Sequence, residues 1–322
     1  MIKRTQNKVA ESRFTLPVVM AYAIAVWLAS GLLLPSIPFS SNILLRGAWV
    51  QFVSFLLSAF LMVELNNGNA LIRIYSRMVS SSFIVLACAA NMLFGSMAGA
   101  IVQLCVVASL TTFFHSYQDK QSMGWIFYTF LFIGLASTVF VQILYYVPFV
   151  WLMMQIQLAS FGWRTFWASL IGLLTPYWFI LPVAIYQEEF GSFVTHFEQL
   201  AVFQLPDYSL LTVNQVVIFA FVVTLALTGS IHYWRNCLSD KFRIRQLYGC
   251  FTVLTAVTIA FIVAQPQHFQ ALMHILIIAT SPLIGHFLAL TYTRITNYAF
   301  YVICAAALLI TLLNLWMPSL SF

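Results

Sequence analysis

The chain has 322 residues, of which 62% are hydrophobic and 7% are charged, and its formal net charge is +6. Soluble domains contain about 45–50% apolar and about 25% charged residues. This chain therefore cannot cover itself with a polar surface, which excludes a water-soluble enzyme. The apolar runs are long and lack strict alternation, so they predict an all-α integral membrane protein rather than a β-barrel.

Eleven membrane-spanning helices are expected, because one span needs about 20 predominantly apolar residues. In chain order the expected spans are 14–35, 47–65, 78–94, 98–114, 123–137, 139–154, 165–186, 212–234, 247–264, 270–291 and 297–316. The run from 78 to 114 is too long for one helix, and the "GSMAG" segment at 95–99 is a natural turn within it. The run from 123 to 154 is long for one span and short for two.

Lysine and arginine decide how 123–154 is divided. With two spans there and the N-terminus inside, thirteen of the fourteen Lys and Arg residues fall on the inner side, and Arg46 lies outside. With one span, Arg164, Arg294 and the cluster at 235–245 would lie opposite the N-terminal cations. Because inner loops carry the excess of Lys and Arg, the pattern predicts eleven spans, N-terminus in and C-terminus out. The positive charge is thus a topology signal, and nucleic-acid binding is not expected.

The whole chain, residues 1–322, is expected to be one polytopic domain with a cytoplasmic N-terminus at 1–13. The basic start is not followed by a small-residue cleavage site, which predicts a retained signal anchor. The sequence contains no N-x-S/T acceptor, which favours a bacterial inner membrane. Its five cysteines are scattered without a CxxC spacing, and it has no Walker A, G-x-G-x-x-G or H-E-x-x-H motif. No metal and no cofactor is therefore expected.

The loop 187–211 is the one long outer loop in this topology. It holds all acidic residues of the outer side, which are Glu188, Glu189, Glu198 and Asp207. Wound at 100° per residue, 188–201 is an amphipathic helix that Pro206 ends. Its apolar stripe consists of Phe190, Phe193, Val194, Phe197, Leu200 and Ala201. Its polar side consists of Glu188, Glu189, Ser192, Thr195, His196 and Gln199. Such a helix is expected to lie on the outer interface and to cap its own bundle.

Glu189 and His196 project from nearly the same angle of this helix, seven residues apart. A carboxylate beside an imidazole can form a general acid/base pair, because it orients the ring and raises its basicity. The alternative is a solvated polar face, which any interfacial helix needs. Arg46 is the lone outer cation. It can contact a phosphate or pair with the acidic loop, or it can anchor the interface by snorkelling.

The histidines and prolines within the expected spans can each be interpreted in two ways. His268, His274 and His286 belong to the tenth span or its flank, and a histidine inside a span is a functional candidate. Since no acid lies within these spans, buried interhelical hydrogen bonds are the expected role. Pro148, Pro176 and Pro282 interrupt three spans. Interrupted spans can mark a midplane binding site, and they can also be simple packing kinks.

Two stretches carry a resemblance. "ELNNGNALIRIYSR" (64–77) and "WRTFWASLIGLLTPYW" (163–178) resemble an uncharacterised family of bacterial multi-pass inner-membrane proteins, from which no activity carries over. In outline the chain is also similar to GT-C-type glycosyltransferases and to polymerases and ligases of lipid-linked glycans. In one such polymerase group the largest outer loop joins the seventh and eighth spans and carries an essential acid, and 187–211 has that place here. GT-C enzymes usually carry an acid in the first outer loop, and 36–46 contains none.

The leading hypothesis is an envelope enzyme resembling polyprenyl-linked glycan transferases or polymerases, whose partners are the lipid bilayer and a lipid-linked glycan. Glu188 or Glu189 would be the base, His196 the proton partner and Arg46 the pyrophosphate contact. One alternative is a transporter of a lipid or small solute. Another is a non-catalytic membrane subunit of a larger complex. An outer groove open to lipid would favour transfer, a polar midplane cavity would favour transport, and a filled bundle would favour the subunit.

Overall fold

The computed structural model describes residues 4–33, 42–188, 190–202 and 205–316, and every regular element in these ranges is a helix. The α-helices are α1 (Thr5–Glu11), α2 (Thr15–Leu33), α3 (Asn42–Asn69), α4 (Met78–Ala89), α5 (Met97–His115), α6 (Met123–Ser137), α7 (Val147–Ile156), α8 (Trp163–Tyr186), α9 (Phe190–Ala201), α10 (Val213–Asn236), α11 (Phe242–Ala264), α12 (Phe269–Leu290) and α13 (Arg294–Trp316). The 3-10 helices are η1 (Asn91–Gly95), η2 (Val141–Tyr146), η3 (Tyr208–Leu210), η4 (Cys237–Ser239) and η5 (Pro266–His268).

Eight of the described helices are long and apolar enough to cross a membrane, so the chain is a multi-pass α-helical membrane protein. They are α2, α5, α8, α10, α11, α12, α13 and the Trp49–Asn69 part of α3. The other three expected spans correspond to α4, α6 and the η2–α7 segment, which are apolar but only 10–17 residues long. The sixth expected span is divided where Pro148 enters the first turn of α7. The helices α8 and α12, by contrast, continue through Pro176 and Pro282.

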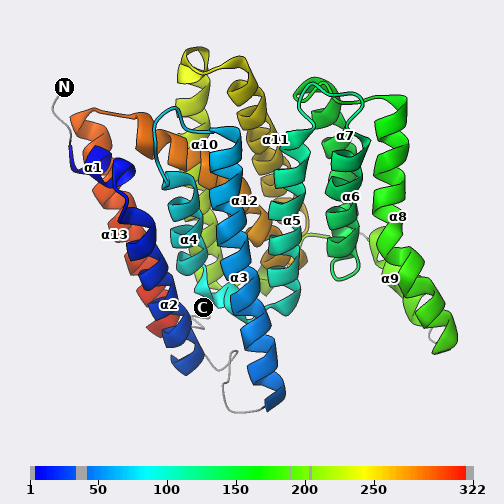
Figure 1. Ribbon diagram of the computed structural model, residues 1–322. Coiled ribbons are helices and arrows are strands. Elements are labelled where there is room, and N and C mark those ends of the chain that lie inside the picture. The colour runs from blue at the N-terminus through cyan, green and yellow to red at the C-terminus, as the bar shows by residue number, and fades with distance from the viewer. Residues whose placement is uncertain (1–3, 34–41, 189, 203–204, 317–322) are drawn as a thin grey trace.

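The helix α12 lies in the middle of the bundle (Figure 1). Every residue from Ala271 to Ala289 is buried, since α4, α5, α10 and α11 pack around it. Figure 1 shows α1, α2 and α13 at one edge of the molecule and α8 and α9 at the other. The most central helix is thus shielded from lipid as well as from water.

Small residues let the helices approach closely, as is common where lipid gives helices no hydrophobic reason to associate. A Cβ atom at Gly229 of α10 would lie 2.7 Å from the carbonyl carbon of Leu283 in α12. One at Gly285 of α12 would lie 3.1 Å from Cα of Val79 in α4. Glycine at these positions therefore sets the spacing between α12 and its neighbours.

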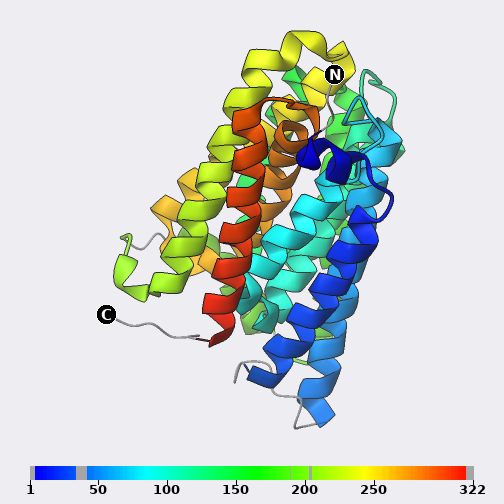
Figure 2. The ribbon, with the colours of Figure 1, turned by 90° about the vertical axis from the view of Figure 1, so that its left-hand side faces the viewer.

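The short helix α1 lies across one end of the bundle (Figure 2). The side-chain amide of Gln6 donates to the carbonyl oxygen of Leu288 (2.6 Å) and to the hydroxyl of Thr291 (2.8 Å), and Asn7 donates to the carbonyl of Thr291 (3.0 Å). These bonds satisfy carbonyl groups that the end of α12 leaves without helical partners. The expected N-terminal segment 1–13 therefore contains an ordered helix that is fastened to the core.

Replacing Gly229 by leucine is expected to destabilise the protein, because the new side chain meets the backbone of α12, which cannot move aside. Overpacking of this kind costs about 1–3 kcal/mol. Thermal unfolding of the detergent-purified protein measures the effect. Thr224→Leu is the matched control, since Thr224 is exposed on the same helix. Equal unfolding temperatures for the two variants would contradict the close contact.

Candidate functional site

A groove of about 230 Å³ lies where α9 folds back against the ends of α6 and α8. The residues that line it are Thr138, Tyr177, Ile180, Val183, Ala184, Gln187, Phe193 and His196. One part of this lining is polar, with hydroxyl, amide and imidazole groups, and the other part is hydrocarbon. We name this hollow the outer groove, after the side on which loop 187–211 is expected to lie, and its divided lining can accommodate a ligand with a polar and an apolar part.

Aromatic contacts and one hydrogen bond hold α9 in place beside the groove. The ring of Tyr177 in α8 packs on Phe193 and Phe197, with centroid distances of 6.2 and 5.0 Å. The hydroxyl of Tyr145 in η2 donates to the carbonyl oxygen of Leu200. The sequence predicts these three α9 residues on the apolar stripe, and all three are partly buried here.

His196 is the imidazole residue of the outer groove. Its Nε2 atom lies 2.9 Å from the carbonyl oxygen of Ser137, the last residue of α6. A carbonyl can only accept, so Nε2 carries the proton and Nδ1 of the neutral ring keeps a lone pair. The bond also satisfies a carbonyl that the end of α6 leaves free. His196 therefore has a fixed tautomer and one nitrogen able to take up a proton.

The placement of His196 differs from the expected one. The sequence puts it on the polar side of the 188–201 helix, whereas it is partly buried on the packed side, with its ring 5.5 Å from that of Phe197. Val194, expected on the apolar stripe, is 39% exposed instead. The reason is tertiary: the carbonyl of Ser137 offers His196 a partner that helical periodicity alone cannot indicate.

In the part of the chain that the structure describes, no other predicted site residue lies beside His196. Glu188 lies in the exposed turn after α8 with a φ of 58°, a left-handed conformation typical of helix ends. Glu189 lies outside the described residues, as does the side chain of Arg46, whose backbone belongs to the first turns of α3. Asp207 has a local structural role, since Ser209 donates to it from its backbone N–H (3.0 Å) and its hydroxyl (2.6 Å). These bonds lower the pKa of Asp207.

A second hollow, of about 180 Å³, lies further along α9. It is lined by Gln142, Gln199, Val202, Gln267 and His268. Three side-chain amides supply both donors and acceptors without charge. Such a lining suits a neutral, hydroxyl-rich ligand better than an ion.

A buried ionic cluster lies at the opposite end of the bundle. The carboxylate of Asp240 is 2.9 Å from Nε of Arg73 and 3.0 Å from Nε2 of His286, and the side chains of Asp240 and His286 are fully buried. The rings of His232 and Tyr248 lie 5.4 and 4.9 Å from that of His286. Among the described residues, Nδ1 of His286 and the hydroxyl of Tyr248 have no hydrogen-bond partner. Buried ionisable groups within membrane helices are functional candidates by default.

No acid is expected within the spans, and the acid that meets His286 comes from a turn instead. The turn between α10 and α11 folds over the end of α12 and inserts Asp240 beside it. The sequence contains an indication of this pairing, because the expected topology places Asp240 and one end of the tenth expected span on the same side of the membrane. For His274 the expected interhelical hydrogen bond is present, with Nδ1 2.8 Å from Oε1 of Gln103 in α5.

Comparison with known proteins gives no match: no family model, no curated protein and no solved structure is significantly similar to this chain. The class of the protein therefore rests on its helices, and its function must be argued from the outer groove, the second hollow and the buried ionic cluster.

Replacement of Asp240 by alanine is expected to destabilise the fold more than replacement by asparagine. Alanine leaves the buried Nε2–H of His286 without an acceptor, which costs about 1–3 kcal/mol, whereas asparagine retains a carbonyl oxygen. Thermal unfolding of both variants in the same detergent compares them. If Asp240→Ala unfolds at the wild-type temperature, the buried pair does not contribute to stability.

Proposed function

We propose that the chain crosses a bacterial inner membrane eleven times, with α1 inside and α9 outside, so that α4, α6 and η2–α7 are short spans. The support is the clustering of cationic turns at the α1 end. Arg243 donates to the side-chain oxygen of Asn69 (3.0 Å) and lies over the ring of Tyr117, at 5.6 Å, while Arg73 pairs with Asp240. Three turns that carry Lys or Arg thus meet at one end, which is the pattern of an inner face.

Reporter fusions test this topology. Fusions after Tyr75, Lys120 and Arg243 are expected to report the cytoplasm, and fusions after Asp207 and Phe322 the outer side. A cytoplasmic signal at Asp207 would reverse the orientation and move the outer groove to the inner face. Agreement at Tyr75 with disagreement at Lys120 would instead refute α4 or α5 as a span.

We propose that the protein is an enzyme that transfers or polymerises a polyprenyl-linked glycan at its outer end. The observation that carries the proposal is the outer groove, whose polar lining around His196 and Gln187 adjoins the hydrocarbon lining from Ile180 and Val183. A lipid-linked sugar has the same division between a polar head and an apolar chain. Ile180 and Val183 are themselves 39% and 54% exposed, so a prenyl chain can lie against this hydrocarbon part of the lining.

In this proposal His196 takes up a proton through Nδ1 from the attacking sugar hydroxyl, as a general base. The hydroxyl oxygen bonds to the anomeric carbon of the lipid-linked sugar, the bond from that carbon to the pyrophosphate oxygen breaks, and polyprenyl pyrophosphate leaves. The glutamines of the second hollow hold hydroxyls of the growing glycan. Glu188 or Glu189 is the carboxylate that assists His196, and Arg46 contacts the pyrophosphate. These last roles require the 187–190 turn and the start of α3 to approach the groove when substrate is bound.

The test is complementation of a deletion strain, with the envelope glycan measured directly. His196→Gln is expected to lower activity by about 10²–10⁴-fold, the usual contribution of a general base. It should leave folding intact, because the glutamine amide can still donate to the Ser137 carbonyl. Glu188→Gln and Glu189→Gln identify the assisting carboxylate. Glu198→Gln is the matched control, since Glu198 is exposed on the same helix and does not line the groove.

Normal glycan from all the variants at wild-type protein level would rule out catalysis at the outer groove. A second function would then be favoured, that of a transporter of a lipid or small solute coupled to protons. The buried Asp240–His286 pair supports it, because His286 lies four residues after Pro282 in the central helix. For a transporter, His286→Gln and Asp240→Asn abolish complementation while His196→Gln does not. The enzyme proposal expects the reverse.

A further inference from the structure

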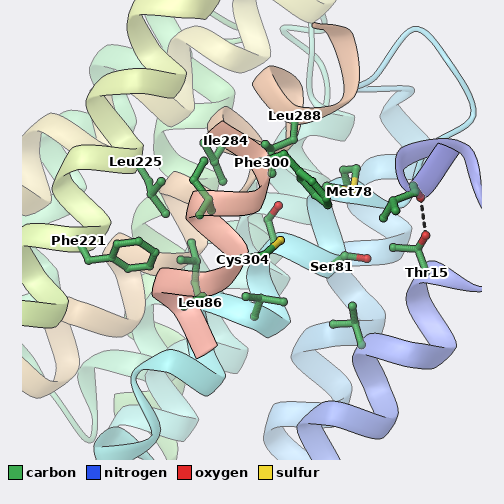
Figure 3. Close-up of a pocket in the computed structure, with 16 residues that line it drawn as sticks. Thr15, Met78, Ser81, Leu86, Phe221, Leu225, Ile284, Leu288, Phe300 and Cys304 are labelled. Carbon is green, nitrogen blue, oxygen red and sulfur yellow. Dashed lines mark hydrogen bonds between the residues drawn. The ribbon is translucent and has the colours of Figure 1, made fainter. Parts of the chain in front are cut away.

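A cavity of about 120 Å³ lies under α13, between α2, α4, α10 and α12 (Figure 3). Phe221 and Leu225 of α10, Ile284 of α12 and Cys304 of α13 are among the side chains that line it. Apolar cavities of similar size, about 150 Å³, stay free of water. The helix α13 packs on α2 and α4 at one edge of the molecule. Phe221 and Cys304 of the lining are only partly buried. The cavity therefore adjoins the surface that faces lipid. Hydrocarbon is therefore the material available to fill it.

The polar groups of the cavity are concentrated at its α1 end. The hydroxyl of Thr15, the first residue of α2, donates to the carbonyl of Val9. Ser81 and Ser82 lie about 4–6 Å along α4 from its first residue, at 1.5 Å per residue, whereas Leu86 lies about 12 Å along it. The lining thus changes from hydroxyl-bearing to purely apolar with increasing depth.

The two serines have unused hydrogen-bonding capacity. Their side chains are 3% and 8% exposed, and within the described part of the chain neither hydroxyl has a partner. Helical serines commonly bond a carbonyl in the preceding turn, as Ser80 does with Arg77 (3.0 Å). Both residues line the cavity, but their hydroxyl oxygens are covered by neighbouring atoms, so a ligand oxygen reaches one of them only after a rotation of the serine side chain toward the cavity.

Three cations and one acid, Glu11, lie near lining residues of the same end of the cavity in the sequence. Lys8 precedes Val9, which lines the cavity, Arg13 lies two residues before Thr15, and Arg294 begins α13. All three are exposed. A ligand whose apolar part fills the cavity would therefore carry its head into a basic region, where an anionic group is favoured.

We propose that this cavity binds one anionic glycerophospholipid of the leaflet on the α1 side. A segment of one acyl chain occupies the space between Leu86, Phe221 and Cys304, and the rest of the chain stays in the bilayer. An ester oxygen accepts from Ser81 or Ser82, and the phosphate lies among Lys8, Arg13 and Arg294. The order of apolar, hydroxyl-bearing and cationic groups along the site matches the order of chain, ester and phosphate in the lipid. This site is independent of the outer groove and of the function proposed for it.

Cys304 provides a test with the unaltered chain. The delipidated protein in detergent is treated with an uncharged apolar maleimide, and alkylation is followed at each cysteine by mass spectrometry. Phosphatidylglycerol is expected to slow alkylation of Cys304 at least fivefold and to leave Cys237, in the η4 turn, unchanged. Phosphatidylcholine with the same acyl chains is expected to protect Cys304 much less. No protection by phosphatidylglycerol, or equal protection by both lipids, would overturn the proposal.

Variants then assign the parts of the site. Ala307→Phe fills the cavity and is expected to abolish the protection, whereas Ala305→Phe, exposed on the same helix, retains it. The double variant Ser81→Ala/Ser82→Ala is expected to weaken protection, and the triple variant Lys8→Gln/Arg13→Gln/Arg294→Gln to remove the preference for phosphatidylglycerol. Retention of full lipid preference by the triple variant would refute the phosphate assignment. If Ala307→Phe does not fold, the alkylation result on the unaltered chain decides.

Discussion

The complete burial of α12 is the constraint on which the rest of the structure depends. Lipid supplies no hydrophobic force that could drive this helix inward, so close packing must hold it there. Gly229 and Gly285 permit that packing by bringing the backbones of α10 and α4 close to α12. Once the helix is enclosed, a polar group on it is costly unless it has a partner within the protein. Gln103 supplies one for Nδ1 of His274, and Asp240 supplies one for Nε2 of His286.

The two ends of the bundle differ in how they use polar groups. At the α1 end a charged group is buried, because Asp240 lies fully covered between a histidine and a half-exposed arginine. Because removal of one partner from a buried pair is far more costly than removal of an exposed one, this end is suited to holding a fixed arrangement. At the α9 end the polar groups are neutral amides, hydroxyls and the imidazoles of His196 and His268 around open hollows. That end is suited to binding and releasing a ligand.

The segment from η2 to α9 shows which sequence features produce the open hollows at the α9 end. Pro148 starts α7 and so divides a span that hydropathy alone would treat as one run. The 3-10 helix before it carries Tyr145, whose hydroxyl holds the end of α9, and Gln142, which lines the second hollow. The irregular part of the bundle is therefore the part that shapes the candidate ligand sites, in keeping with the rule that non-helical backbone at membrane depth lines cavities or is covered by protein.

Much of this protein follows from its sequence alone. Composition determines the solvent and the helical class, and apolar run length predicts the helices, including the division at 95–99 and a helix after residue 188. The orientation and the count of eleven spans stay predictions from charge. Side-chain partners could not be obtained in this way, because they depend on which helices meet. Periodicity placed His196 on a polar face, yet the free carbonyl at the end of α6 draws it to the packed one. Asp240 and His286 are 46 residues apart, and only the fold of the α10–α11 turn over α12 brings the carboxylate to the imidazole.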